Sequence, residues 1–129
     1  MNVLAIGAHP DDLEYGCAGA LIRHVHRGDR VYLAVVTDGS QGGDPKMRRQ
    51  EQLDAAKIIG AEEVFFLDFP DTLFECNRES ITRIEEVVRK VDAEIVYSHF
   101  GEDTHQDHRN VARAVVPAAR SVPNLLYFE

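Results

Sequence analysis

Short apolar runs alternate with longer amphipathic segments along the whole chain. The short runs are rich in β-branched and aromatic residues and stop at polar, Gly or Pro residues, which is typical of buried strands. The longer segments carry apolar residues at a helical spacing. The predicted strands are 2–8, 30–37, 63–68, 94–99 and 124–128, and the predicted helices are 15–27, 46–59, 78–90 and 107–120.

Residues at the segment ends agree with these elements. Gly28 and Gly60 follow the first two predicted helices, where glycine commonly forms a C-terminal cap. Asn77 precedes the third helix and is a favourable N-cap. Strictly alternating strands and helices imply βαβ units, so the sequence predicts an α/β fold with a mainly parallel sheet and helices on both faces.

Composition narrows the class of protein. The length of 129 residues suits a single domain, and 44% apolar residues is ordinary for a globular chain. A net charge of -8 argues against nucleic acid or an anionic membrane surface as the main partner. Cys17 and Cys76 have neither zinc-thiolate spacing nor disulfide-scaffold density, and the first residues lack a basic region. We therefore expect a cytoplasmic protein without a membrane span.

Polar residues collect where the predicted strands end. In open α/β sheets, ligands bind outside the carboxyl ends of the strands, so we expect His and Asp from four strand ends to meet at one rim. These strand ends are residues 8–12, 37–40, 68–71 and 98–108.

The first of these ends, His9-Pro10-Asp11-Asp12, offers one imidazole and two carboxylates on a rigid turn. Catalytic zinc takes three such protein ligands and keeps one position for water. If His9 and Asp12 bind the metal, Asp11 is left beside it and could deprotonate the bound water. A His-Pro-Asp sequence by itself is more often only a turn.

His105 and His108 follow the fourth strand and are three residues apart, which places both on one face of a starting helix. Either could be the third metal ligand, and the other could donate a proton or stabilise an oxyanion. Asp107 could simply be an acidic residue favoured at a helix N-terminus. The simplest interpretation of His24 and His26 is that they lie on the surface of the first helix.

Two motifs resemble the paired signature of the LmbE-like (PIG-L) deacetylases. They are Ala-His-Pro-Asp-Asp at 8–12 and His-Gln-Asp-His at 105–108. Further matches run along nearly the whole chain, and they are 37–39, Arg48, Glu51, 55–56, 59–60 and 69–71. The resemblance implies a Rossmann-like three-layer sandwich and a zinc-dependent hydrolase that removes an N-acetyl or other N-acyl group from an amino-sugar-containing substrate.

The resemblance also implies roles for the metal residues. His9, Asp12 and His108 would bind Zn²⁺, and Asp11 would be the general base. His105 would polarise the carbonyl or stabilise the tetrahedral intermediate.

Other roles follow from the same resemblance. Asp107 would orient a histidine ligand, and Arg48 would contact the substrate. Asp71 would bind a sugar hydroxyl or support that arginine. His99 and Asp103 are further candidates for the pocket or for contact with the ligands.

The resemblance differs from this chain in two respects. Many relatives carry Glu where this chain has Ser40. Members are usually some two hundred residues or more, so we expect residues 1–129 to be a single LmbE-like domain that either lacks its C-terminal third or is an unusually small member of the family. An uncovered sheet edge would then favour a homo-oligomer.

Two other functions remain open at this point. One is a different metal-dependent hydrolase, such as a phosphoesterase with two metals. The other is a non-catalytic α/β domain that binds a nucleotide or partner through its loops, although no glycine fingerprint supports it. A separation of His9 and His108 beyond about 8 Å would favour the second, because zinc–ligand bonds are only about 2 Å long.

Overall fold

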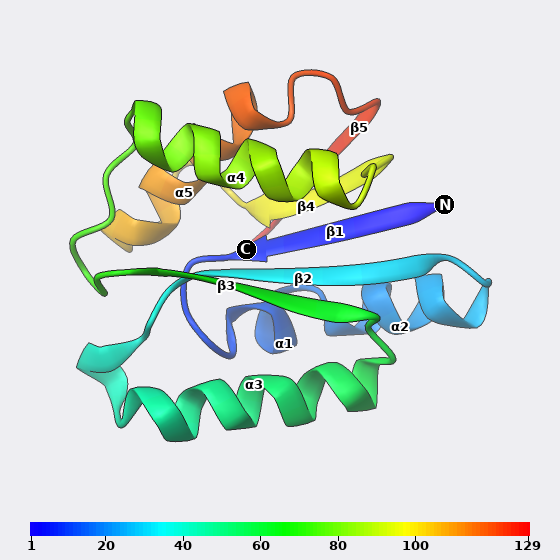
Figure 1. Cartoon of the computed structure of the whole chain (residues 1–129), viewed down its shortest axis with the longest axis horizontal. Coiled ribbons are helices and arrows are strands. Elements are labelled where there is room, and N and C mark those ends of the chain that lie inside the picture. Colours follow the sequence, from blue (N-terminus) through cyan, green and yellow to red (C-terminus); the bar gives the residue numbers. More distant parts are fainter.

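The computed structural model covers all 129 residues and has one five-stranded sheet with helices on both faces (Figure 1). All strand pairs are parallel, and the strand order is β3-β2-β1-β4-β5. The predicted α/β class and parallel sheet are therefore confirmed. The strands are β1 (Asn2–Gly7), β2 (Arg30–Thr37), β3 (Glu63–Phe69), β4 (Ile95–His99) and β5 (Asn124–Phe128). The helices are α1 (Asp12–Gly16), α2 (Ala18–His26), α3 (Pro45–Ile59), α4 (Arg78–Lys90) and α5 (Gln106–Ala118), with a short 3-10 turn at Ser40–Gly42.

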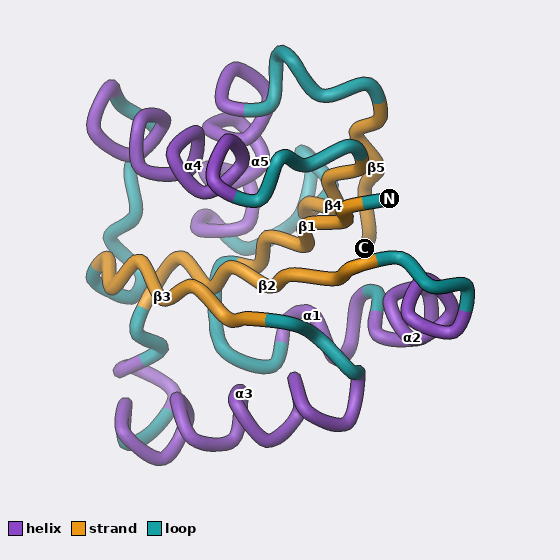
Figure 2. Tube along the Cα trace, turned by 45° about the vertical axis from the view of Figure 1, so that its right-hand side comes forward, coloured by secondary structure: helices purple, strands orange, loops and turns teal.

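Two apolar cores hold the layers together. The helices form two groups on opposite sides of the strands, with α4 and α5 on one face and α1, α2 and α3 on the other (Figure 2). Alternate residues of each strand point to each face. On β2, Val31 and Leu33 belong to the core beneath α1 to α3, whereas Ala34 and Val36 belong to the core beneath α4 and α5.

Local signals at the helix ends are those that the sequence predicts. Gly28 and Gly60 have φ values of 90° and 89°, a conformation that glycine adopts without strain. Asn77 caps α4 in a reciprocal capping box with Ser80.

The first predicted helix is divided in two. Cys17, at φ -147°, interrupts it between α1 and α2, and α1 begins at Asp12 rather than near residue 15. The earlier start places Asp11 at the N-cap of α1, directly after the strand end. None of the helices is long and apolar enough to cross a membrane.

The strand order fixes where the polar loops meet. The chain moves from β1 through β2 to β3 on one side, and then crosses to β4 and β5 on the other side of β1. The loops after β1 and β4 consequently diverge, and a crevice of this kind is where open α/β sheets bind ligands. His9 and His99 lie at the ends of these two strands.

Candidate metal centre and active-site cavity

Three side chains converge on one point above the crevice. The Nδ1 atom of His9 lies 3.3 Å from Oδ2 of Asp12, Nε2 of His108 lies 3.2 Å from that oxygen, and the two nitrogens are 3.3 Å apart. In a tetrahedral zinc site with bonds of about 2.0–2.1 Å, neighbouring ligand atoms lie roughly 3.3–3.4 Å apart. The triangle of His9, Asp12 and His108 therefore fits three corners of such a site.

The outer nitrogen of each of these histidines faces a carboxylate. Nε2 of His9 lies 2.8 Å from Oδ2 of Asp107 and 3.0 Å from Oδ1 of Asp71. Nδ1 of His108 lies 3.2 Å from Oδ2 of Asp103. A carboxylate behind a histidine ligand fixes the ring orientation and raises the basicity of the ligand.

Asp107 is fully buried and is held by the chain around it. Its carboxylate accepts the backbone N–H of Thr72 at 2.8 Å and of Phe74 at 3.3 Å, in addition to its contact with His9. Asp107 therefore does more than favour the start of α5. Its carboxylate lies where it can hold the ring of His9 in one orientation.

Asp71 lines the candidate active-site cavity and contacts His9. Its two oxygens contact His9 and the backbone N–H of Gln41, at 3.0 Å and 2.9 Å, and it is buried. It forms no ion pair with Arg48. The structure thus places Asp71 beside a candidate ligand.

His99 and Asp103 also belong to this cluster. His99 is buried, stacks on the ring of His108 at 3.9 Å between centroids, and has Nε2 3.2 Å from Oδ2 of Asp12. The N–H of Ala8 donates to the same nitrogen at 2.9 Å, so that nitrogen is an acceptor in the neutral ring. Burial lowers the pKa of His99, which agrees with a neutral imidazole.

The cluster carries an excess of negative charge. Burial alone would lower the pKa of His9, but hydrogen bonds and charges from Asp12, Asp107 and Asp71 raise it to about 9. Burial would raise the pKa of Asp12, yet His108, His9 and His99 hold it well below its usual range. Protons on His9 thus balance buried carboxylates. Because metal ligands must be deprotonated, a divalent cation could take the place of such protons.

Asp11 is the candidate base and has a strained backbone. Its φ of 77° is in the left-handed region, which few non-glycine residues adopt. The buried side chain of Gln52 accepts the Asp11 N–H at 3.0 Å and donates to Glu14 at 2.7 Å. Burial raises the pKa of Asp11, and the guanidinium of Arg48, 3.6 Å away, opposes that effect. Gln52 could not be recognised from the sequence, because a single Gln within a polar helix carries no distinguishing signal.

His105 acts as the N-cap of α5. Its Nδ1 accepts the N–H of Asp107 at 3.0 Å, so Nε2 carries the proton in the neutral ring. Burial lowers the pKa of His105, which favours that neutral form. The ring centroid is 4.6 Å from that of His9 and 4.7 Å from that of His108, as the three-residue spacing predicted.

Arg48 connects the two loops at the edge of the site. It donates to the carbonyls of Gly39 at 2.7 Å and Pro10 at 2.9 Å. Its side chain is largely buried, at 17% exposed, and borders the cavity. The guanidinium therefore supports the loop that carries Asp11.

These side chains line a polar cavity of about 350 Å³ that is open to solvent. Its lining consists of His9, Asp11, Asp12, Gln41, Gly42, Arg48, Asp71, Thr72, His105 and His108. Asp107 lies behind His9 and does not line it. The expectation that all four strand ends meet at one rim holds for β1 and β4 but only in part for β2 and β3. Asp38 and Asp68, at the ends of β2 and β3, line a different cavity because these strands lie on the far side of β1.

The interpretation of His24 as a surface residue was wrong. His24 is buried on α2, with Nδ1 2.7 Å from Asp29 and Nε2 3.0 Å from the hydroxyl of Tyr97. It lies three residues after Leu21 and so shares the inward face of the helix. That spacing was the signal in the sequence. His26 is exposed and forms no such contacts, so the surface interpretation is right for that residue.

Comparison with known proteins identifies the family. Residues 4–119 match the family model PIG-L, described as GlcNAc-PI de-N-acetylase. This chain belongs to the PIG-L family.

Two relatives and one solved structure are similar to this PIG-L domain over most of its length. It is 37% identical to the "uncharacterized deacetylase YaiS" of Escherichia coli, over 99% of this chain and 73% of that protein. It is 26% identical to a 4-oxalmesaconate hydratase of Pseudomonas putida, over 94% of this chain and 52% of that protein. The structure of the N,N'-diacetylchitobiose deacetylase from Pyrococcus horikoshii superposes with a TM-score of 0.88 and 25% identity, over 92% of this chain and 49% of that one. The chain thus spans about half to three-quarters of the length of these proteins.

Proposed function

We propose that this PIG-L domain binds one Zn²⁺ through His9, Asp12 and His108 and hydrolyses an N-acetyl or other N-acyl group. The observation that carries the proposal is the triangle of ligand atoms, with edges of 3.2 to 3.3 Å. A bound zinc ion would polarise the amide carbonyl and lower the pKa of a water molecule. The contacts of Asp107, Asp71 and Asp103 with the outer nitrogens support the same ligand set.

Asp11 and His105, which also line the cavity, have separate roles in the proposed reaction. Asp11 accepts a proton from the attacking water, since its side chain is 59% exposed and lines the cavity beside the ligands. Nε2–H of His105 donates a hydrogen bond to the oxygen that becomes negative when water adds to the carbonyl. The C–N bond then breaks while protonated Asp11 gives its proton to the leaving nitrogen, so Asp11 returns to the carboxylate and the products are the free amine and the carboxylic acid.

The proposed substrate is a small-molecule N-acetylated amino sugar or a glycoconjugate. The description of the family model and the diacetylchitobiose deacetylase support this class. The cavity supports it too, because no apolar side chain lines it and its polar groups can pair with sugar hydroxyls. Arg48 presents guanidinium donors at its edge, which suit hydroxyl, carboxylate or phosphate oxygens.

A hydratase is the second candidate, because one relative carries that name. Both reactions add water, so the same base and metal could serve either. The non-catalytic alternative is less well supported, since the nitrogens of His9 and His108 lie 3.3 Å apart, within reach of one ion. A two-metal phosphoesterase predicts two bound ions, which metal analysis can count.

Replacing the base tests the reaction. We expect Asp11→Asn to keep its zinc and to release free amine from zinc-loaded assays with N,N'-diacetylchitobiose about 10²- to 10⁴-fold more slowly than wild type. Amine release can be followed with an amine-reactive dye. Asp54→Asn, an exposed carboxylate on α3, is the matched control and should keep the wild-type rate. A wild-type rate in Asp11→Asn would show that another group is the base.

A further inference from the structure

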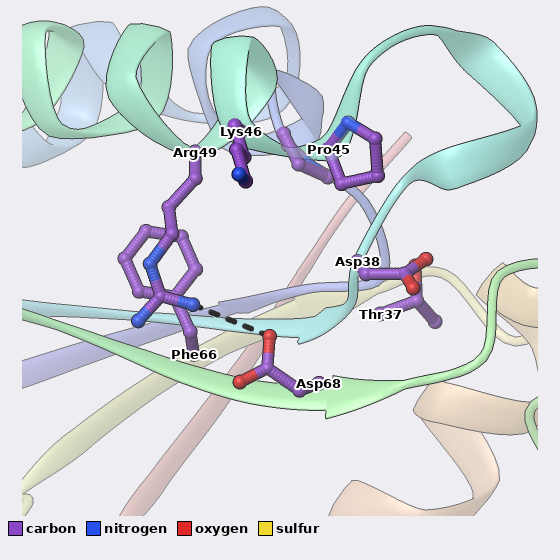
Figure 3. A pocket seen from close by; sticks show the side chains of 8 residues that line it. Thr37, Asp38, Pro45, Lys46, Arg49, Phe66 and Asp68 are labelled. Carbon is purple, nitrogen blue, oxygen red and sulfur yellow. Dashed lines mark hydrogen bonds and ion pairs between the residues drawn. The ribbon is translucent and has the colours of Figure 1, made fainter.

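A second cavity lies between the start of α3 and the ends of β2 and β3 (Figure 3). Its volume of about 170 Å³ is smaller than the roughly 300–1,000 Å³ of sites for drug-sized ligands, so it suits a ligand of only a few heavy atoms. Its lining consists of Pro10, Thr37, Asp38, Pro45, Lys46, Arg49, Phe66 and Asp68. Pro10 is the only residue in this set that belongs to the loop of the metal centre.

Thr37 provides an unpartnered polar group. It is 1% exposed, and its hydroxyl has no hydrogen-bond partner. Val31 and Leu33 of the same strand pack beneath α3, and residues at even spacing along a strand share a face, so the Thr37 side chain faces the cavity side of the sheet. Buried hydroxyls without a partner are rare because they cost stability. A ligand in the cavity would satisfy this one.

Two opposite charges on the cavity walls are also free. Lys46 forms no ion pair, and it extends from α3 on one side of the cavity (Figure 3). Asp38 lies on the other side, where one carboxylate oxygen accepts the N–H of Ser40 at 3.0 Å and the other has no protein partner. Lys46 and Asp38 are too far apart to form an ion pair with each other.

The other two charges are already engaged. Arg49 lies over the ring of Phe66, 4.0 Å from its centroid, and its Nη1 is 3.3 Å from Asp68. Asp68 has a φ of 56°, at a point where the β2–β3 register shifts. This irregularity turns the carboxylate of Asp68 towards Arg49. Arg49 and Asp68 thus pair with each other, and Lys46 and Asp38 remain to bind a ligand.

We propose that this cavity binds a small zwitterion of amino-acid size. Its carboxylate would face Lys46, and its ammonium group would face Asp38 and the hydroxyl of Thr37. Lys46 is exposed and Asp38 is half-buried, so water can solvate either group. A zwitterion would pair with both of them, whereas a ligand with a single charge would pair with only one. The ring of Phe66 and two prolines, Pro10 and Pro45, would cover its apolar part. The proposal does not depend on the hydrolytic activity.

Binding can be tested by titrating the ¹⁵N-labelled protein with L-alanine and following amide chemical shifts. We expect saturating shifts at Thr37, Asp38 and Lys46. Acetate and methylammonium, each added alone at the same concentration and ionic strength, should not saturate them. Thr37→Val and Lys46→Gln should each weaken L-alanine binding at least about fivefold, the effect of losing one hydrogen bond. Lys57→Gln, an exposed lysine near the other end of α3, should bind as wild type.

Thermal melting separates binding from folding. Thr37→Val removes an unpartnered hydroxyl, so its melting temperature should equal or exceed that of the wild type. The proposal is overturned if L-alanine gives no saturating shifts, if acetate alone saturates the same amides, or if Thr37→Val and Lys46→Gln both bind as tightly as wild type.

Discussion

Asp11 holds a backbone conformation that costs energy, and its neighbours stabilise it. Non-glycine residues in the left-handed region cost about 1–3 kcal/mol and cluster at functional sites. The N–H of Asp11 is paired with Gln52, and the preceding carbonyl, that of Pro10, accepts from Arg48. The position of the Asp11 carboxylate therefore depends on two side chains from α3.

Gln52→Leu tests this support. The change leaves the N–H of Asp11 and the half-buried carboxylate of Glu14 without their partner, so we expect a loss of about 1–3 kcal/mol in the free energy of unfolding. The kcat of deacetylation should fall while KM changes little, because the base is displaced while the substrate contacts remain. Urea denaturation and steady-state kinetics measure the two effects.

Gln50→Leu is the matched control for this variant. Gln50 lies on the exposed side of the same helix and bonds only to Asp54. Its replacement should change stability by no more than about 0.5 kcal/mol. Equal losses in both variants would contradict the role assigned to Gln52.

At this scale the sequence predicted residues with distinctive chemistry and missed those defined by their surroundings. His9 and Asp12 were identified because imidazole and carboxylate groups at strand ends indicate metal binding, and the family resemblance selected His108 over His105. The structure brings His9, Asp12 and His108 together. The burial of His24 was signalled by its spacing from Leu21, whereas the role of Gln52 depends on which loop packs against its face of α3. Only the packed structure contains that information.

Among the elements, α1 is positioned by a close contact with the last strand. A Cβ atom added at Gly16 would lie 2.2 Å from Cδ2 of Phe128, so the absence of a side chain lets the ring pack against the helix. Phe128 is buried and also lies 4.8 Å, between ring centroids, from His99. The contact thus links α1, β5 and the edge of the metal centre.

Two glycine substitutions test this contact. Gly16→Ala should reduce stability by about 1–3 kcal/mol because it displaces the buried ring. Gly19→Ala, three residues along, meets nothing within 4 Å and lies inside α2, so it should increase stability by about 0.5–1 kcal/mol. Opposite signs in urea denaturation are the expected result, and a stabilised Gly16→Ala would contradict the close packing.

The elements were largely predictable because each has a local signal. Hydrophobic periodicity, the glycine caps and Asn77 placed every strand and the later helices within a residue or two. The break at Cys17 was missed, since Leu21, Ile22 and Val25 keep a helical spacing after it and no proline or polar turn marks an interruption. The early start of α1 follows from the left-handed turn at Asp11, which a non-glycine residue rarely signals.

For the whole molecule, the order of the strands decides which loops meet. Alternating elements predicted parallel pairing, but no local pattern states that β1 lies between β2 and β4. That order brings residues 9–12 against residues 103–108 and leaves Asp38 and Asp68 with a separate cavity. The cytoplasmic location, the homo-oligomer and the limits of the domain stay predictions.

The zinc content of the purified protein tests the central claim most directly. We predict one zinc ion per chain by elemental analysis after equilibration with zinc and removal of the excess. His9→Ala and His108→Ala should each fall well below this ratio, since loss of one of three ligands removes much of the binding energy, while Asp11→Asn should retain it. Unchanged zinc in His9→Ala and His108→Ala, or two tightly bound ions in the wild type, would contradict the proposed metal centre.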